Sequence, residues 1–159
     1  MRSSTIALLL VATAMACDKG TVTPGSSGGY RIVPASYGEH SNVSAAAREK
    51  CEFDEELTGQ VADAIAGRKD GSGKVLTMVI TRVRGAEVAW EGEISVIVEG
   101  TLESDGEQLG DFRVQRRGLG GVGGGMAGVC RGLDGIAETM AEDIAGWLGK
   151  PGHDSKLGQ

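Results

Sequence analysis

The stretch TLESDGEQLGDFRV, residues 101–114, constrains the fold of this chain more than any other. Asp105 and Gly106 form a two-residue turn signal, because a type I′ hairpin turn needs positive φ at both central residues. The residues on either side alternate between apolar and polar, as in strands with one buried face. We therefore expect two antiparallel strands over residues 93–103 and 108–116, joined by this turn.

A third strand is expected immediately upstream, over residues 74–84. Its sequence, KVLTMVITRVR, carries β-branched residues on both alternating faces. Such a pattern indicates a central strand that is either covered on both sides or has a second face suited to binding. The three strands together predict an antiparallel meander.

Helical patterns stand on both sides of the meander. Over residues 44–66, apolar side chains recur every four residues from Phe53 to Ile65, and Ser44 is a suitable N-cap. Residues 129–148 form a second amphipathic pattern, which ends before Gly149 and Pro151. A short strand at residues 30–33, closed by Pro34, precedes them all.

The order strand, helix, three strands, helix predicts an α+β fold. We expect a two-layer sandwich, with a mixed but mostly antiparallel sheet and two helices on one face. One domain should cover residues 30–150, and residues 151–159 should form a flexible tail.

The first 29 residues predict export. Residues 1–16 have a single cation and an apolar run too short for a permanent membrane span, which is typical of a signal peptide. Cys17 follows small residues and the segment resembles a bacterial lipobox, although Ala14 stands where that motif usually has Leu. The resemblance implies lipid attachment at Cys17; ordinary cleavage of a soluble secreted protein is the alternative. Residues 17–29, rich in Gly, Ser and Thr, fit a flexible tether.

The other two cysteines, Cys51 and Cys130, form an even number in an oxidising compartment. We predict a disulfide between them, which requires the starts of the two helices to be neighbours. Two reduced buried thiols are the alternative. We expect no metal site, since the two histidines lack ligand-like spacing to a cysteine.

Residues 118–123 match the glycine pattern of a dinucleotide-binding turn. The match lacks its context, because the preceding strand is the second arm of a hairpin and no strand follows the last helix. We expect no nucleotide. Glycine N–H groups and nearby arginines could instead contact an anion or a partner, with a simple crossover loop as the alternative. The candidate contact residues are Arg116, Arg117, Gly120, Gly123 and Arg131.

Composition narrows the function further. The formal net charge of −6 argues against nucleic acid as a partner. We find no familiar catalytic motif, and we expect neither catalytic residues nor a cofactor.

Several features together resemble a group of small, uncharacterised bacterial envelope lipoproteins. These are the lipobox and tether, the strand KVLTMVITRVRG, the hairpin, the Gly-rich loop and the closing helix GLDGIAETMAEDIAGWL. The order of elements is also similar to that of lipoproteins that activate peptidoglycan synthases. The resemblance implies a bacterial cell-envelope location, anchored to either membrane and facing the periplasm.

We therefore expect a non-enzymatic lipoprotein that presents its domain to an envelope protein or to copies of itself. A periplasmic inhibitor or immunity protein, an envelope hydrolase with an unrecognised site, and a lipid or ligand binder are the alternatives.

Overall fold

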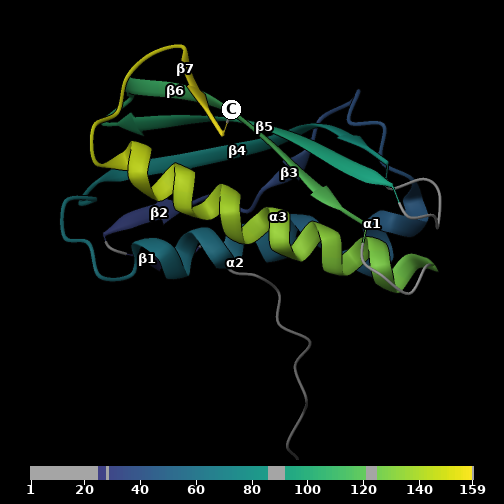
Figure 1. The fold of residues 1–159 in the computed structure, drawn as a ribbon. Helices are drawn as coiled ribbons and strands as arrows, with labels where there is room; N and C mark the ends of the chain where they lie inside the picture. Colours follow the sequence, from purple (N-terminus) through teal and green to yellow (C-terminus); the bar gives the residue numbers. More distant parts are fainter. Residues whose placement is uncertain (1–24, 28, 86–91, 121–124, 159) are drawn as a thin grey trace, which may run out of the picture.

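The computed structural model describes residues 25–27, 29–85, 92–120 and 125–158. These residues form two layers, a mixed sheet and three helices packed against one of its faces (Figure 1). The predicted α+β sandwich is thus confirmed. In chain order the elements are β1 (Gly25–Ser27), β2 (Tyr30–Ile32), β3 (Ser36–Tyr37), α1 (Ala45–Cys51), α2 (Phe53–Ile65), β4 (Lys74–Arg84), β5 (Glu93–Ser104), β6 (Glu107–Leu119), α3 (Gly125–Leu148) and β7 (Ser155–Leu157).

The sheet has the strand order β1-β2-β4-β5-β6-β7, and β3 pairs with β4 beyond β2. Its long pairings, β4 with β5 and β5 with β6, are antiparallel, which confirms the predicted meander. The short pairings of β2 and β3 with β4, and of β7 with β6, are parallel. The sheet is therefore mixed, as expected.

The predicted turn joins β5 to β6. Asp105 has a φ of 51° and Gly106 a φ of 83°, the positive values that a type I′ turn requires. The turn fixes the register of the hairpin, in which Gly100 lies opposite Phe112. A Cβ on Gly100 would collide with the Phe112 ring, so this position needs glycine.

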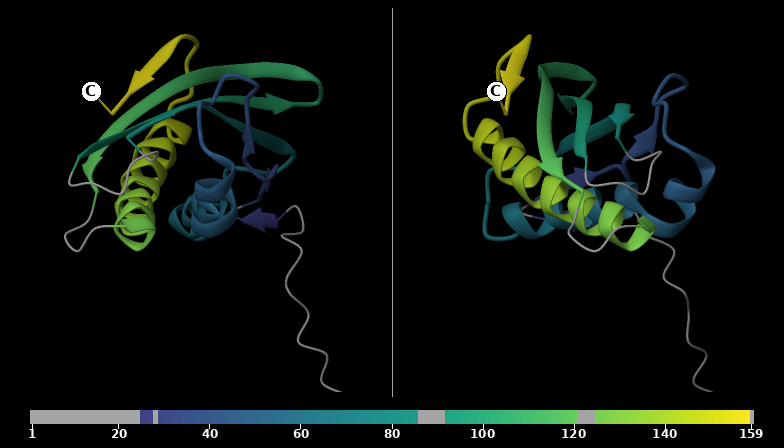
Figure 2. Two further views of the ribbon diagram at one scale, coloured as in Figure 1. Left: turned by 90° about the vertical axis from the view of Figure 1, so that its right-hand side faces the viewer. Right: turned by 45° about the vertical axis from the view of Figure 1, so that its right-hand side comes forward.

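The core lies between the sheet and the helices. Figure 2 shows the sheet arching over α2 and α3, which run side by side in the same direction. Fully buried side chains from both layers meet there, including Leu76, Met78, Ile80, Val98, Leu57, Val61, Met140 and Ile144. The opposite face of the sheet carries no helix among the described residues.

The helix expected over residues 44–66 is instead two helices. Ser44 caps the first, accepting a hydrogen bond of 3.2 Å from the Ala47 N–H as predicted. Glu52 then adopts a left-handed conformation with a φ of 44°, and its N–H donates to the Arg48 carbonyl. This closes α1 and starts α2 in a new direction.

The two ends of the domain also differ from expectation. Residues 151–159 were expected to be a flexible tail, yet within their described part β7 pairs in parallel with β6. The Trp147 indole N–H fixes this segment by donating to the Ser155 hydroxyl at 3.1 Å. At the other end, β1 lies within the predicted tether and pairs with β2. β1 and β7 thus lie at the two ends of the strand order in the sheet.

Candidate functional site

The face of the sheet that carries no helix has an unusual surface on β4. Side chains alternate along a strand, so Val75, Thr77, Val79 and Thr81 point away from the helices. All four are half-buried and β-branched, whereas the outward face of a solvated antiparallel sheet usually carries long polar side chains. This confirms that β4 has a second face with apolar character.

An open hollow of about 650 Å³ lies over this part of the sheet. Short side chains from the two central strands, Thr77, Val79 and Thr101, form its floor. Longer side chains from β6 and the C-terminal segment surround the floor, among them Gln108, Arg113 and Lys156. The hollow therefore arises because small residues lie between rows of large ones.

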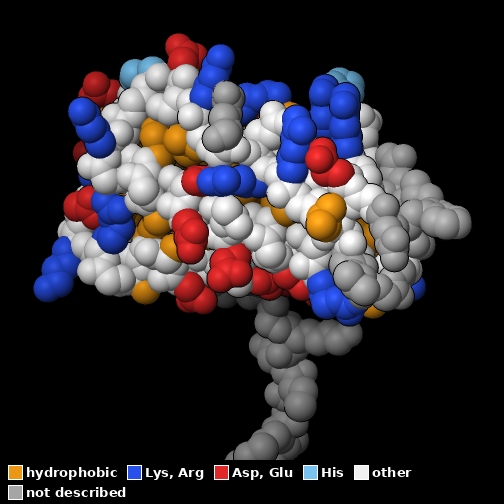
Figure 3. Space-filling model, in the orientation of Figure 1, with side chains coloured by type: hydrophobic (Ala, Val, Ile, Leu, Met, Phe, Trp, Pro, Cys, Tyr) orange, Lys and Arg blue, Asp and Glu red, His pale blue; other side chains and the backbone are white. Residues whose placement is uncertain are grey.

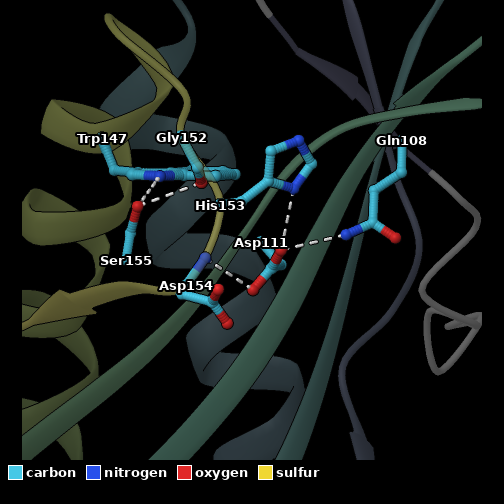
Figure 4. Close-up of polar contacts among 7 residues, drawn as sticks. All are labelled: Gln108, Asp111, Trp147, Gly152, His153, Asp154 and Ser155. Atoms are coloured by element: carbon cyan, nitrogen blue, oxygen red, sulfur yellow. Dashed lines mark hydrogen bonds and ion pairs between the residues drawn. The ribbon is translucent and has the colours of Figure 1, made fainter.

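Asp111 builds one wall of the hollow by holding the C-terminal segment (Figure 4). One carboxylate oxygen, Oδ1, lies 3.1 Å from Nδ1 of His153 and accepts a 3.0 Å hydrogen bond from the Gln108 amide. The other oxygen, Oδ2, accepts from the Asp154 N–H at 3.0 Å. The backbone N–H of Asp111 also donates to the Gly152 carbonyl. The Asp111 side chain thus ties the residues just before β7 to β6.

Glu99 is another of the three carboxylates that line the hollow, the third being Asp154. Glu99 pairs with the guanidinium of Arg113 on the neighbouring strand at 2.5 Å. Both side chains are about half exposed, so the pair contributes little to stability. Glu99 and Asp111 are therefore already engaged by N–H donors, and the carboxylate of Asp154 also lines the hollow.

Three of the five predicted anion-contact residues, Arg116, Arg117 and Gly120, are engaged within the protein. Arg116 donates two hydrogen bonds to Asp143 on α3, at 2.7 and 2.6 Å, which raises the pKa of its guanidinium. Arg117 lies 3.6 Å from the Glu93 carboxylate, and the Gly120 N–H donates to the Gly92 carbonyl. Arg131 lies on α3, and Gly123 lies outside the described residues.

The predicted disulfide between Cys51 and Cys130 is present, with the two Cα atoms 4.9 Å apart. It joins the last residue of α1 to the first turns of α3. Because α2 begins at Phe53, two residues after Cys51, the starts of α2 and α3 are neighbours, although the cysteine itself ends α1.

Two further expectations concern a metal and the membrane. In the described ranges, no group of three His, Cys, Asp or Glu side chains is placed to hold a metal ion. The same residues contain no helix that is long and apolar enough to span a membrane. The predicted signal peptide, Cys17 and the tether up to residue 24 lie outside the described residues.

The sequence pattern missed most of this site. Alternation over residues 108–116 puts Asp111 on the face opposite to Phe112 and Val114, but the segment that Asp111 binds lies in the expected flexible tail. The alternation in Ser155-Lys156-Leu157 was the available signal, because it is the pattern of a short strand with one covered face. Three residues are too few for that pattern to stand out.

The described residues define a small α+β domain with one sheet face left free of helices. No protein-family model matches the chain, and no curated protein matches it. Among solved structures, it is similar to protein XCC0632 from Xanthomonas campestris, of the DUF330 family. That match has a TM-score of 0.50 and 11% identity, and it covers 79% of this chain and 88% of the other.

A second similar structure is a candidate lipoprotein from Caulobacter crescentus CB15. It matches with a TM-score of 0.47 and 16% identity, over 77% of this chain and 92% of that one. At these identities, what the chain shares with XCC0632 is the fold, and fold alone does not specify a function.

Proposed function

We propose that this protein is a non-enzymatic cell-envelope lipoprotein, anchored through Cys17, that presents the helix-free face of its sheet to a protein partner. The observation that carries the proposal is the row of half-buried β-branched residues on the outer face of β4. An exposed surface with apolar floor and polar rim is typical of sites that bind other proteins.

The charges around the hollow support binding in place of catalysis. A general acid or base needs a carboxylate that is free to exchange a proton with a substrate. Asp111 instead accepts N–H donors from the C-terminal segment, and Glu99 accepts from Arg113. These two of the three carboxylates that line the hollow therefore maintain the shape of the surface.

The length of the tether supports a partner close to the membrane. Eight peptide units separate Cys17 from Gly25, the first residue of β1. Fully extended, they reach at most about 28 Å. A lipid on Cys17 would keep the domain within that distance of the membrane surface, and the partner must present its binding surface there.

Cross-linking in intact cells tests the proposal. A photo-reactive residue replaces Thr77 on the floor of the hollow or, as a control, Glu138, which is exposed on α3. We expect a discrete protein adduct from position 77 and none from position 138. An adduct of twice the mass would identify a second copy as the partner. Adducts from position 138 alone, or from neither position, would contradict the proposal.

The anchor is tested separately. Cys17→Ser should abolish incorporation of labelled palmitate and move the protein from the membrane fraction to the soluble periplasmic fraction. Retention of both properties in the variant would refute lipidation at this residue.

A further inference from the structure

β6 is much longer than the strand that pairs with its outer edge. It runs from Glu107 to Leu119, whereas β7 pairs only with Phe112, Arg113 and Val114. Beyond Val114, no described strand pairs with β6 on this side. The last five residues of β6 therefore form an edge that β7 leaves uncovered.

The backbone of β6 indicates which groups point to this edge. Along a strand, successive residues direct their N–H and C=O groups to opposite sides. The Asp111 N–H donates to Gly152 in the C-terminal segment, so odd-numbered residues face the edge. The Gly120 N–H donates instead to Gly92 beside β5, so even-numbered residues face β5. Arg117 thus offers its N–H and C=O at the edge, and Leu119 offers its N–H.

The described residues leave open space beside Arg117. The chain leaves the edge at Gly158, which has a φ of 71°. An open groove of about 490 Å³ lies where it leaves, lined by Gln115, Arg116, Arg117 and Gly158. Three outward groups are few, but β7 itself pairs with β6 over only three residues.

The side chains at this edge specify the chemistry of an incoming strand. Leu119 is 80% exposed and is the one large hydrophobic side chain exposed in the described part of the chain. Arg117 points to the same face of the sheet and is 64% exposed, and its pairing with Glu93 at 3.6 Å is weak. An added strand would place one side chain beside Arg117 and the next on that face beside Leu119.

The distribution of charge favours an acidic strand at this edge over one bound against the helical layer. The helical layer is acidic, with Asp54, Glu55, Glu56, Asp63, Glu138 and Glu142 on α2 and α3. Figure 3 shows acidic side chains in the lower part of this face, where the helices lie, and more basic side chains above them toward the sheet. An acidic segment would be repelled by the first surface and attracted by the second.

From these features we infer that the open edge of β6 binds an extended acidic segment of a partner protein as an additional strand. The segment carries Asp or Glu beside Arg117 and, two positions away, an apolar residue beside Leu119. Strand addition to an uncovered edge supplies main-chain hydrogen bonds, and the side chains supply selectivity. The inference rests on the proposed function in that a partner protein binds this domain, and it adds the conformation of the bound segment. It requires neither the lipid anchor nor the hollow.

A second copy of the chain fits this edge less well. Antiparallel pairing of two β6 edges about a two-fold axis near Arg117 would bring the two Arg117 side chains together. Like charges in directly opposed positions destabilise a strand pair. An acidic segment meets no such repulsion.

The test uses the exported chain with Cys17→Ser and a displayed library of random ten-residue peptides. We expect enrichment of peptides with Asp or Glu two positions from an apolar residue and without proline. In amide-exchange measurements, the N–H groups of Arg117 and Leu119 should exchange readily in the free protein and become protected when an enriched peptide binds.

Three variants separate the edge from the rest of the basic surface. Leu119→Pro removes an outward N–H, and an edge strand tolerates proline there, so binding should be lost. Arg117→Glu should weaken binding at least about tenfold. Arg84→Glu is the matched control, because Arg84 lies on the same face two strands inside the edge, and it should change affinity less than about threefold.

The inference would be overturned if no peptide were enriched, or if the enriched peptides bound Leu119→Pro as well as the unmodified chain. Binding of anionic lipid vesicles in place of peptides would overturn it equally. Unchanged protection of the β4 and β5 amides shows that each variant is folded. Because cross-linking at position 77 reports on the hollow, failure at the edge leaves the proposed function separately testable.

Discussion

At the scale of single residues, Tyr37 is the clearest case of a side chain whose chemistry the fold changes. Its ring packs under the guanidinium of Arg48, with the Arg48 Cζ atom 4.4 Å from the ring centroid. Burial, followed by the nearby Asp54 carboxylate, raises the pKa of the Tyr37 hydroxyl to about 12. The sequence could not predict this, because Tyr37 meets the two helices only after β3 has joined the sheet.

The raised pKa predicts a loss of stability in alkaline solution. The folded protein favours the protonated hydroxyl, so its contribution is present below the ordinary pKa of 10.0 and is lost as the pH rises to about 12. After allowance for solvent screening, we expect a loss of about 1–2 kcal/mol in the free energy of unfolding. Urea titrations at pH 8 and near pH 12 measure it. Tyr37→Phe should lose correspondingly less, and an equal loss in both proteins would contradict the assignment to Tyr37.

At the scale of elements, local patterns predicted most of the long strands and helices. The meander was predictable because the Asp105-Gly106 turn and the alternation around it are local signals. The break between α1 and α2 was not, because nothing in the apolar spacing marks Glu52 as left-handed. β7 was not predicted because its pairing depends on contacts with Asp111 and Trp147. The periodicity of residues 155–157 does not reveal those contacts. Local signals thus sufficed for the meander, whereas β7 depends in part on Asp111, a residue distant in the sequence.

Glu52 offers a direct test of the helix break. A non-glycine residue in the left-handed region is strained by about 1–2 kcal/mol, and glycine is not. Glycine also loses more backbone entropy on folding, so we expect Glu52→Gly to raise the free energy of unfolding by about 0.5 kcal/mol. Glu52→Val, with its β-branched side chain, should lower it by about 1–2 kcal/mol. Urea denaturation measures both, and equal destabilisation by the two variants would argue against strain at this position.

At the scale of the whole molecule, the disulfide and the sheet hold the two helical segments together. Cys51 and Cys130 are 79 residues apart in the sequence, and the segment between them contains the whole meander. The cross-link therefore closes a loop around most of the domain. The even number of cysteines beyond Cys17 was enough to predict it, and the parallel course of α2 and α3 explains why it forms.

Removing this cross-link should cost much of the stability of the domain. In the chain-entropy description, closing a loop of this size contributes about 4.5 kcal/mol. We expect the Cys51→Ala, Cys130→Ala double variant to show a free energy of unfolding lower by about 3–5 kcal/mol, measured in guanidinium chloride without reductant. Adding reductant should bring the unmodified protein to the same value. A difference that persisted under reductant would assign the loss to side-chain packing instead.

The position of β1 has a mechanical consequence if the chain is anchored at Cys17. A pull on the anchor acts first on Gly25, which lies at the open end of the short hairpin formed with β2. Force applied there separates the paired residues one at a time, beginning with Gly25 and Ile32. Releasing the three residues of β1 lengthens the connection to the membrane by about 10 Å. The short hairpin of β1 and β2 therefore yields first, while the meander and the disulfide keep their structure.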